Sequence, residues 1–137
     1  MCGLTGAVIG NRKTRRVRDI DALTDTFTRL LLLSEHRGPH ATGVAWVKRN
    51  GIMHVAKEPK PARQFVQSGT YIDWLLGVDR DVTYLMGHTR WPSRGNITNP
   101  ANNHPQCLPF GEDGAVLATH NGTLVGVEHH FRRLGLP

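Results

Sequence analysis

The feature that most constrains the fold of this chain is an Asn-Gly pair between two strand-like runs of equal length. Residues 44–49 read VAWVKR, Asn50-Gly51 follows, and residues 52–57 read IMHVAK. Asn-Gly readily adopts the positive φ values of a type I′ turn, whose twist matches that of paired strands. The sequence therefore predicts a β-hairpin over residues 44–57 with a type I′ turn at its tip.

Three further apolar or β-branched runs have the length and composition of strands: Leu4–Ile9, Val82–Met86 and Ala115–Thr119. Between the last two, residues 91–112 are rich in Pro, Asn and Gly. This composition predicts a long loop, and a loop of this length is usually functional if it is ordered.

Apolar residues recur at helical spacing from Asp19 onward, which predicts a helix with Asp19 as its N-cap. Residues 65–76 predict a weaker helix interrupted at Ser68-Gly69. Residues 124–134 predict a last helix that Gly135 ends. Antiparallel strands with helices kept apart from them indicate an α+β fold.

Composition narrows the class of protein. With 137 residues, of which 39% are hydrophobic, the chain suits one domain with a real core. Two cysteines are too few for a disulfide scaffold. The longest wholly apolar run is Leu30–Leu33, and the N-terminus lacks the pattern of a signal peptide. We therefore expect a soluble, cytoplasmic protein with no membrane partner.

The chain is basic, with 17 Lys and Arg against 11 Asp and Glu and a net charge of +6. Part of this excess lies in one short segment, made up of Arg12, Lys13, Arg15, Arg16 and Arg18. Such a segment can contact phosphates or nucleic acid. It lacks interleaved aromatic residues, which favours a solvated loop next to a helix.

Cys2 carries the most informative chemistry in the sequence. If the initiator Met1 is removed, which a small second residue allows, Cys2 becomes the N-terminal residue. Its α-amine, with a reference pKa of about 8, can then take the thiol proton and activate the nucleophile without a histidine partner. The alternative is a small residue that follows Met1 and has no catalytic role.

Two other segments could complete such a site. Asn121-Gly122 directly follows an expected strand, and an Asn amide with a Gly backbone N–H supplies two donors for an oxyanion. Asn-Gly is also common in ordinary turns. Arg90 follows another expected strand and is suited to holding a carboxylate through two parallel hydrogen bonds, unless it is a surface Arg at the sheet edge.

No metal site and no cofactor are expected. His129 and His130 are adjacent, so they point in different directions on a helix and make a poor chelate. His104 and Cys107 are too isolated for a structural zinc site.

Five blocks of the sequence together resemble the class II glutamine amidotransferase domain. They occur in the family's order and span nearly the whole chain: Met1-Cys2-Gly3-Leu4-Thr5-Gly6, Arg37-Gly38-Pro39-His40-Ala41-Thr42-Gly43, Gly87-His88-Thr89-Arg90-Trp91, His104-Pro105 and His120-Asn121-Gly122. Each block alone is modest, but five in register with Cys at position 2 make a specific signal. The chain resembles most closely the glutaminase half of enzymes such as glucosamine-6-phosphate synthase.

The resemblance implies an N-terminal-nucleophile hydrolase fold, a four-layer αββα sandwich of antiparallel sheets between helical layers. Residues 1–137 would form the N-terminal part of a glutaminase domain. The family has further strands beyond the last helix, with an Asp that binds the α-ammonium of glutamine. The domain is therefore expected to be C-terminally incomplete.

The resemblance also implies an activity, the hydrolysis of L-glutamine to L-glutamate and ammonia. Cys2, freed of Met1, would attack the side-chain amide carbon and form a thioester, with its own α-amine as base. The Asn121 side chain and the Gly122 N–H would form the oxyanion hole. With Met1 still attached, the nitrogen of Cys2 is an amide and cannot act as base. Ammonia would pass to an acceptor bound by a synthase domain or subunit.

The substrate-binding roles carry over in the same way. Arg90 would clamp the α-carboxylate of glutamine, helped by Ser93. Trp91 would close the pocket wall, His104 would sit in the pocket loop, and Arg37 would lie near the nucleophile.

The chain departs from the glucosamine synthase branch at two places. Residues 92–95 read PSRG where that branch has Ala-Thr-His-Gly, and His40 replaces an Asp often found after the Arg-Gly pair. Two other functions therefore stay open. One is a non-catalytic relative that binds a nucleic acid or protein partner through residues 12–18. The other is an N-terminal-cysteine hydrolase acting on a different amide, although Arg90 with Ser93 favours an amino-acid carboxylate.

Overall fold

The computed structural model describes residues 1–10, 16–112, 114–123 and 125–135. The strands are β1 (Gly3–Val8), β2 (Ala41–Lys48), β3 (Met53–Glu58), β4 (Val82–Arg90), β5 (Gln106–Phe110) and β6 (Gly114–Ala118). The helices are α1 (Val17–Leu33), α2 (Ala62–Phe65), α3 (Gly69–Leu76) and α4 (Val127–Leu134), with short 3₁₀ segments η1 (Ser34–Arg37) and η2 (Pro100–Asn102).

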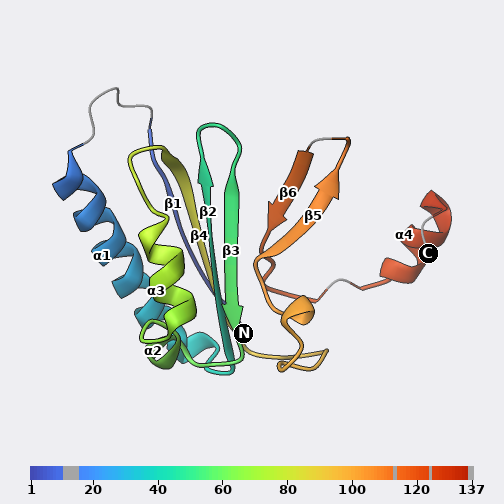
Figure 1. Cartoon of the computed structure of the whole chain (residues 1–137). Coiled ribbons are helices and arrows are strands. Elements are labelled where there is room, and N and C mark those ends of the chain that lie inside the picture. Colours follow the sequence, from blue (N-terminus) through green and yellow to red (C-terminus); the bar gives the residue numbers. More distant parts are fainter. Residues whose placement is uncertain (11–15, 113, 124, 136–137) are drawn as a thin grey trace.

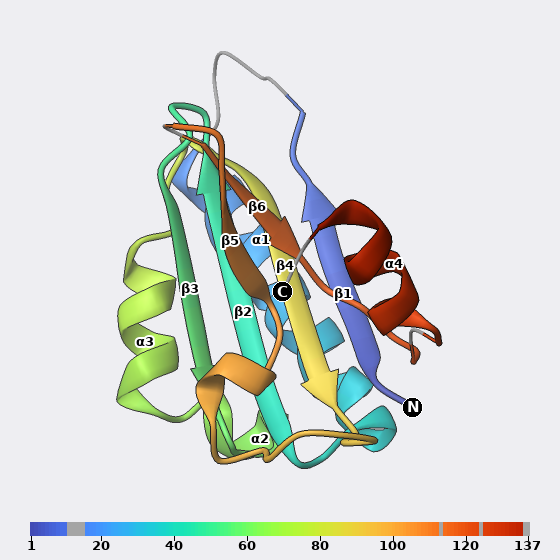
Figure 2. The same ribbon diagram turned by 90° about the vertical axis from the view of Figure 1, so that its right-hand side faces the viewer.

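The strands form two antiparallel sheets. The larger has the order β1-β4-β2-β3, and the smaller consists of β5 and β6. Helices α1, α2 and α3 cover one face of the larger sheet, and the β5–β6 hairpin lies against its other face (Figures 1 and 2). One contact between the sheets joins Cys107 Sγ of β5 to Met53 Sδ of β3, at 3.6 Å. The α+β prediction is therefore confirmed.

Helix α4 stands apart from the other helices. It lies beyond the β5–β6 hairpin as seen from α1 (Figure 1), and none of its residues is buried. The described residues thus form three packed layers, namely helices, sheet and hairpin. The second helical layer of an αββα sandwich stays a prediction.

The β2–β3 hairpin forms where the Asn-Gly pair predicted it, but the type I′ turn is wrong. Gly51 has a φ of +85°, whereas Asn50, like every other described residue that is not glycine, has no positive φ. A type I′ turn needs positive φ at both central residues. Here the Gly51 N–H donates to Lys48 O at 3.0 Å and the Lys48 N–H to Ile52 O at 2.7 Å. This pattern is that of a type I turn followed by a glycine bulge, in which Gly alone takes the left-handed conformation.

Helix α1 begins two residues before the predicted N-cap. Arg16 is the N-cap, and Asp19 lies within the first turn, where its Oδ2 accepts the Arg16 N–H at 2.9 Å. A carboxylate at the third helical position can reach back to the cap N–H in this way, and it also complements the positive end of the helix dipole. Asp19 therefore stabilises the helix start from inside the helix, and its prediction as N-cap is wrong.

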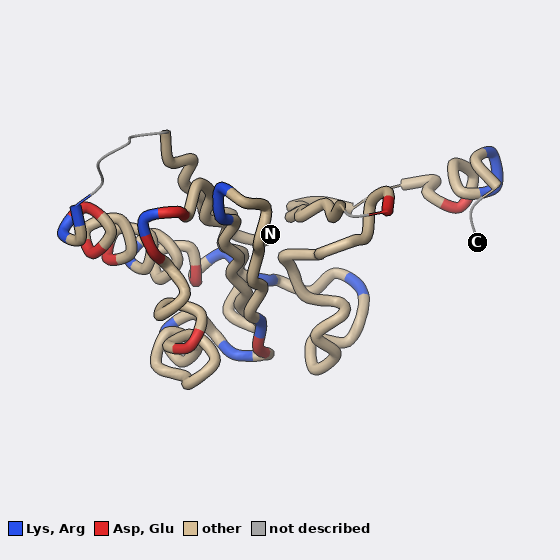
Figure 3. The backbone as a smooth tube through the Cα atoms, turned by 45° about the horizontal axis from the view of Figure 1, so that its top comes forward, with Lys and Arg blue, Asp and Glu red and all other residues tan. Residues whose placement is uncertain are grey.

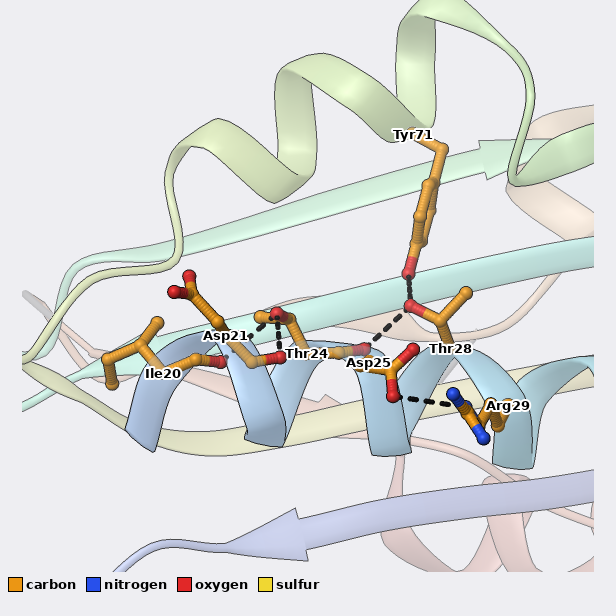
Figure 4. Close-up of polar contacts among 7 residues, drawn as sticks. All are labelled: Ile20, Asp21, Thr24, Asp25, Thr28, Arg29 and Tyr71. Carbon is orange, nitrogen blue, oxygen red and sulfur yellow. Dashed lines mark hydrogen bonds and ion pairs between the residues drawn. The ribbon is translucent and has the colours of Figure 1, made fainter. Parts of the chain in front are cut away.

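One apolar core joins the helices to the sheet. Phe27 of α1 stacks on Trp74 of α3 at a ring distance of 5.7 Å, and Trp74 stacks on Tyr71 at 5.4 Å. The Tyr71 hydroxyl meets Thr28 Oγ1 at 2.7 Å, which links α1 to α3 (Figure 4). Burial raises the pKa of Tyr71, so the hydroxyl keeps its proton for this hydrogen bond.

Two helix predictions are confirmed in part: the break at Ser68 and the end at Gly135 are as predicted, but α2 already ends at Phe65 and α4 begins at Val127. The segment 65–76 divides at Ser68, which caps α3 by accepting the Tyr71 N–H at 3.3 Å. Gly135 ends α4 in the left-handed conformation, with a φ of +67°. Leu124, the predicted first residue of that helix, lies outside the described residues.

The predicted loop over residues 91–112 is too long. Residues 106–110 form β5, which pairs with β6 in the register Cys107–Leu117 and Leu108–Val116. Pro109 hides this strand in the sequence because proline cannot donate to a ladder. It is tolerated here because each strand of a two-stranded sheet leaves one edge unpaired.

Glycine at position 43 lets this loop cross the larger sheet closely. A Cβ at Gly43 of β2 would lie 2.1 Å from the backbone oxygen of His104. The loop backbone would have to move to make room, and overpacking of this kind costs about 1–3 kcal/mol. We therefore expect Gly43→Ala to lower the free energy of unfolding by about this amount, as measured by urea unfolding.

Gly69→Ala is the matched control. Gly69 opens α3, and a Cβ there meets nothing within 4 Å. Alanine at that position is expected to be neutral or slightly stabilising, because it restricts the unfolded chain. Equal losses in both variants would contradict the close approach at Gly43.

Candidate functional site

Cys2 lies beside the end of β4. Strand β1 pairs with β4 so that Gly3 is opposite Thr89, which brings Cys2 to the junction of Arg90 and Trp91. The Trp91 N–H donates to Cys2 Sγ at 3.4 Å, and the thiol lies 3.6 Å from the Trp91 carbonyl oxygen. The half-buried thiol is thus held by the backbone of a single residue.

Asn121 reaches Cys2 from the far end of the sequence. Its Oδ1 accepts the Cys2 N–H at 3.2 Å, and its Nδ2 donates to the Cys2 carbonyl oxygen at 2.9 Å. The amide side chain therefore forms two hydrogen bonds with the Cys2 backbone, although the two residues are 119 positions apart in the sequence. The Asn121 Nδ2 carries two hydrogens, so one remains for a further acceptor.

Gly122 follows Asn121 with a φ of +154°. A Cβ there would lie 3.0 Å from Nε2 of the His120 ring. Glycine is therefore favoured at this position both by its backbone conformation and by the neighbouring ring. The segment predicted for the oxyanion hole thus begins beside the Cys2 backbone.

Arg37 completes the contacts to Cys2. It ends η1, and its Nε donates to the Cys2 carbonyl oxygen at 3.0 Å. Next to it lies a pocket of about 270 Å³ lined by Met1, His36, Arg37 and Trp91. Four of the residues predicted for the site, Cys2, Asn121, Arg37 and Trp91, are therefore brought together.

Arg90 is buried, with 6% of its surface exposed. Its Nη1 donates to Asn103 Oδ1 at 2.6 Å, and its Nη2 donates to the carbonyl oxygens of Arg94 and Gly95, the latter at 3.2 Å. The guanidinium thus orders the loop that follows β4. All three acceptors are neutral oxygens.

Asn103 was not found by sequence reasoning. It is 1% exposed, and besides Arg90 it binds Ile97 O through its Nδ2 at 2.8 Å. Its carbonyl oxygen accepts from Lys57 Nζ at 3.0 Å. The only sequence signal is its place in an Asn-rich loop, which does not distinguish it from its exposed neighbours.

His104 lies in the loop before β5 and packs on His88 of β4. The two ring centroids are 4.7 Å apart. Burial, followed by the positive charge of Arg90, lowers the pKa of His104. Burial also lowers the pKa of His88 to about 3, with a smaller contribution from His104, so His88 is neutral at pH 7.

Ser93, another residue predicted for the site, lies on the surface. It is exposed in the loop after β4, between the half-buried Pro92 and the exposed Arg94. His40, another departure from the family pattern, stands edge-on to the Trp91 ring at 5.1 Å.

Only Arg16 and Arg18 of the basic segment lie among the described residues. Arg12, Lys13 and Arg15 lie outside the described residues. Arg18 is followed at once by Asp19, 4.0 Å from it, and Figure 3 shows acidic positions among the basic ones along α1. The described start of α1 therefore carries charges of both signs.

Among the described residues, no three His, Cys, Asp or Glu side chains are grouped so that they could hold a metal ion. No helix in the described part of the chain has the length and apolar character to span a bilayer.

The buried His88 predicts a pH dependence of stability. In the unfolded chain its pKa is about 6.5, whereas in the fold it is about 3. Between pH 6.5 and pH 3, His88 is protonated in the unfolded chain but stays neutral in the folded chain. The free energy of unfolding should therefore fall as the pH decreases from 6.5 toward 3, by roughly 1 kcal/mol per pH unit.

His88→Gln is expected to flatten this dependence, measured by urea unfolding between about pH 7 and about pH 4. The same exchange at His129, whose side chain is exposed, is the control for the exchange itself. An unchanged slope in His88→Gln would show that other groups cause the dependence.

The chain is similar to curated enzymes over almost its entire length. It is 30% identical over 142 residues to the glutamine–fructose-6-phosphate aminotransferase (isomerizing) of Neisseria meningitidis serogroup A, which covers 98% of this chain and 18% of that protein. It is 29% identical over 126 residues to the enzyme of the same name from Streptococcus mutans serotype c, covering 90% of this chain and 17% of that protein. The chain thus spans less than a fifth of the length of these relatives. No family model and no solved structure matches it.

Proposed function

We propose that the chain is a glutamine amidotransferase module of the N-terminal cysteine type, which hydrolyses L-glutamine to L-glutamate and ammonia. The observation that carries this proposal is the pair of hydrogen bonds between Asn121 and the Cys2 backbone, next to the contact of Cys2 with the Trp91 backbone. The Asn121 amide binds the backbone of Cys2, and the Cys2 thiol contacts the Trp91 backbone, so residues from opposite ends of the sequence meet. The similarity to enzymes named for glutamine as amino donor supports the same function.

Before any turnover, Met1 must be removed, which turns the peptide nitrogen of Cys2 into an amine. The amine takes the thiol proton, and the thiolate attacks the side-chain amide carbon of glutamine. The C–N bond then breaks, and the proton passes to the departing nitrogen, which leaves as ammonia. Water hydrolyses the thioester to glutamate and restores the Cys2 thiol.

The tetrahedral intermediates of both steps carry an oxyanion. The second hydrogen of Asn121 Nδ2 and the Gly122 N–H are the proposed donors. Preorganised donors of this kind contribute about 3–4 kcal/mol each to the lowering of such a barrier. The contact of Asn121 with the Cys2 carbonyl keeps its amide next to the nucleophile.

The remaining predicted residues take binding roles. Arg90 holds the α-carboxylate of glutamine, with Ser93 as a second contact. Trp91 walls the pocket, His104 lies in its loop, and Arg37 orients the Cys2 backbone. The proposed fold is that of the N-terminal-nucleophile hydrolases, and the two facing antiparallel sheets are compatible with it.

The ammonia acceptor is proposed to bind elsewhere. The relatives are named for fructose 6-phosphate as well as glutamine, and more than four-fifths of their length lies outside the region that this chain matches. We propose that a synthase domain or subunit receives the ammonia, and that the reaction takes place in the cytoplasm without a cofactor.

The proposal is tested by intact mass spectrometry before and after incubation with a diazo-ketone analogue of glutamine. The expected result is loss of Met1 and one covalent adduct per chain. Cys2→Ala should give no adduct, because the nucleophile is gone. Cys107→Ala is the matched control, since Cys107 is an exposed free cysteine outside the site, and it should be labelled like the wild type.

An adduct that persists in Cys2→Ala would exclude Cys2 as the nucleophile. A processed wild-type chain that takes no adduct would contradict the glutaminase proposal and favour a non-catalytic relative. The affinity for nucleic acid would then be measured as a function of salt concentration, and a steep decrease would support binding to nucleic acid.

Arg90→Lys tests the carboxylate role. Lysine keeps the charge but loses the planar pair of donors, so the KM for glutamine should rise about tenfold or more, as measured from initial rates of ammonia release. Arg94→Lys, an exposed change in the same loop, should leave KM unchanged. If KM for Arg90→Lys equals that of the wild type, Arg90 does not bind the carboxylate.

A further inference from the structure

The charge of Arg90 has no counter-ion in the described part of the chain. Its hydrogen bonds go to one amide oxygen, of Asn103, and to two backbone carbonyl oxygens. No carboxylate of the described residues forms an ion pair with it, although five other ion pairs occur there. A buried cation held only by neutral acceptors is costly and favours the arrival of an anion.

Asn103 is the side chain that holds Arg90 in this state. Its Oδ1 accepts Arg90 Nη1 at 2.6 Å, which is short for an N–H···O hydrogen bond. An aspartate of the same shape would make the same contact and neutralise the guanidinium. The amide instead orients the cation and leaves its charge uncompensated.

Asn103 is itself fixed from several sides. Its Nδ2 donates to Ile97 O at 2.8 Å, and its carbonyl oxygen accepts from Lys57 Nζ and Gln106 Nε2, both at 3.0 Å. It therefore ties the loop after β4 to strand β3 and to the start of β5. Ile97 O thus holds the Asn103 side chain, whereas Lys57 and Gln106 hold its backbone carbonyl oxygen.

We propose that Asn103 is a positioning residue for recognition of the substrate carboxylate. It orients the Arg90 guanidinium and leaves that positive charge free to bind the α-carboxylate of glutamine. This inference rests on the proposed function, because it assigns how that same site selects its substrate.

The test compares two diazo-ketone labels of Cys2, the glutamine analogue and its counterpart without the α-carboxylate. The measured quantity is the ratio of their second-order labelling rate constants, which reports the preference of the site for a carboxylate. Asn103→Asp should reduce this ratio about tenfold or more, because the new carboxylate occupies and neutralises Arg90. A merely structural role would slow both labels equally and leave the ratio unchanged.

Asn99→Ala is the control from the same loop. Asn99 caps η2 by accepting the Ala101 N–H at 3.0 Å and has no hydrogen bond to Arg90. The ratio of labelling rate constants in Asn99→Ala should equal that of the wild type. If Asn103→Asp does not fold, as judged by thermal unfolding, Asn103→Ser replaces it. Serine is too short to reach Arg90 but adds no charge, so the ratio should fall several-fold.

The outcomes separate the two proposals. If wild-type Cys2 takes neither label, the proposed function fails and the role of Asn103 falls with it. If the wild type prefers the carboxylated label and the folded Asn103 variant keeps the full preference, the role of Asn103 is overturned and the proposed function stands.

Discussion

The antiparallel pairing of β1 with β4 is the constraint on which the candidate site depends. With Gly3 opposite Thr89, the residue before β1 must lie beside the residues that follow β4. A Cβ at Gly3 would come within 2.5 Å of Thr89 Oγ1, and one at Gly38 within 2.4 Å of the Arg90 carbonyl carbon. Two glycines thus let three backbone segments meet where Cys2, Arg37 and Trp91 make contact.

Much of the fold could be predicted from local patterns. The β2–β3 hairpin, the break at Ser68 and the helix ended by Gly135 all depend on residues close in sequence. The errors arise where a local signal fits more than one structure. Strand β5 exists because β6 pairs with it, and Pro109 conceals it from any window of sequence. The turn type depends on a bulge that the Asn-Gly pair does not specify.

The site follows the same division. The contact between Cys2 and Asn121 was expected only because the whole set of blocks resembles a family, since neither residue is distinctive alone. Asn103 was not predicted as a site residue because it is distinguished by its burial and its contact with Arg90. Nothing in an Asn-rich loop indicates which amide is buried. Both Asn side chains are distinguished by the partners that they bind, which the sequence alone does not indicate.

The electrostatics of the site bear on how glutamine would lie in it. Burial and the charge of Arg90 lower the pKa of His104, and burial lowers that of His88 to about 3, so neither ring adds positive charge near pH 7. The guanidinium of Arg90 supplies the positive charge. In the proposed function it would attract the carboxylate of glutamine more strongly than the neutral side-chain amide. In the proposed function this difference turns the carboxylate toward Arg90 and leaves the amide carbon for Cys2.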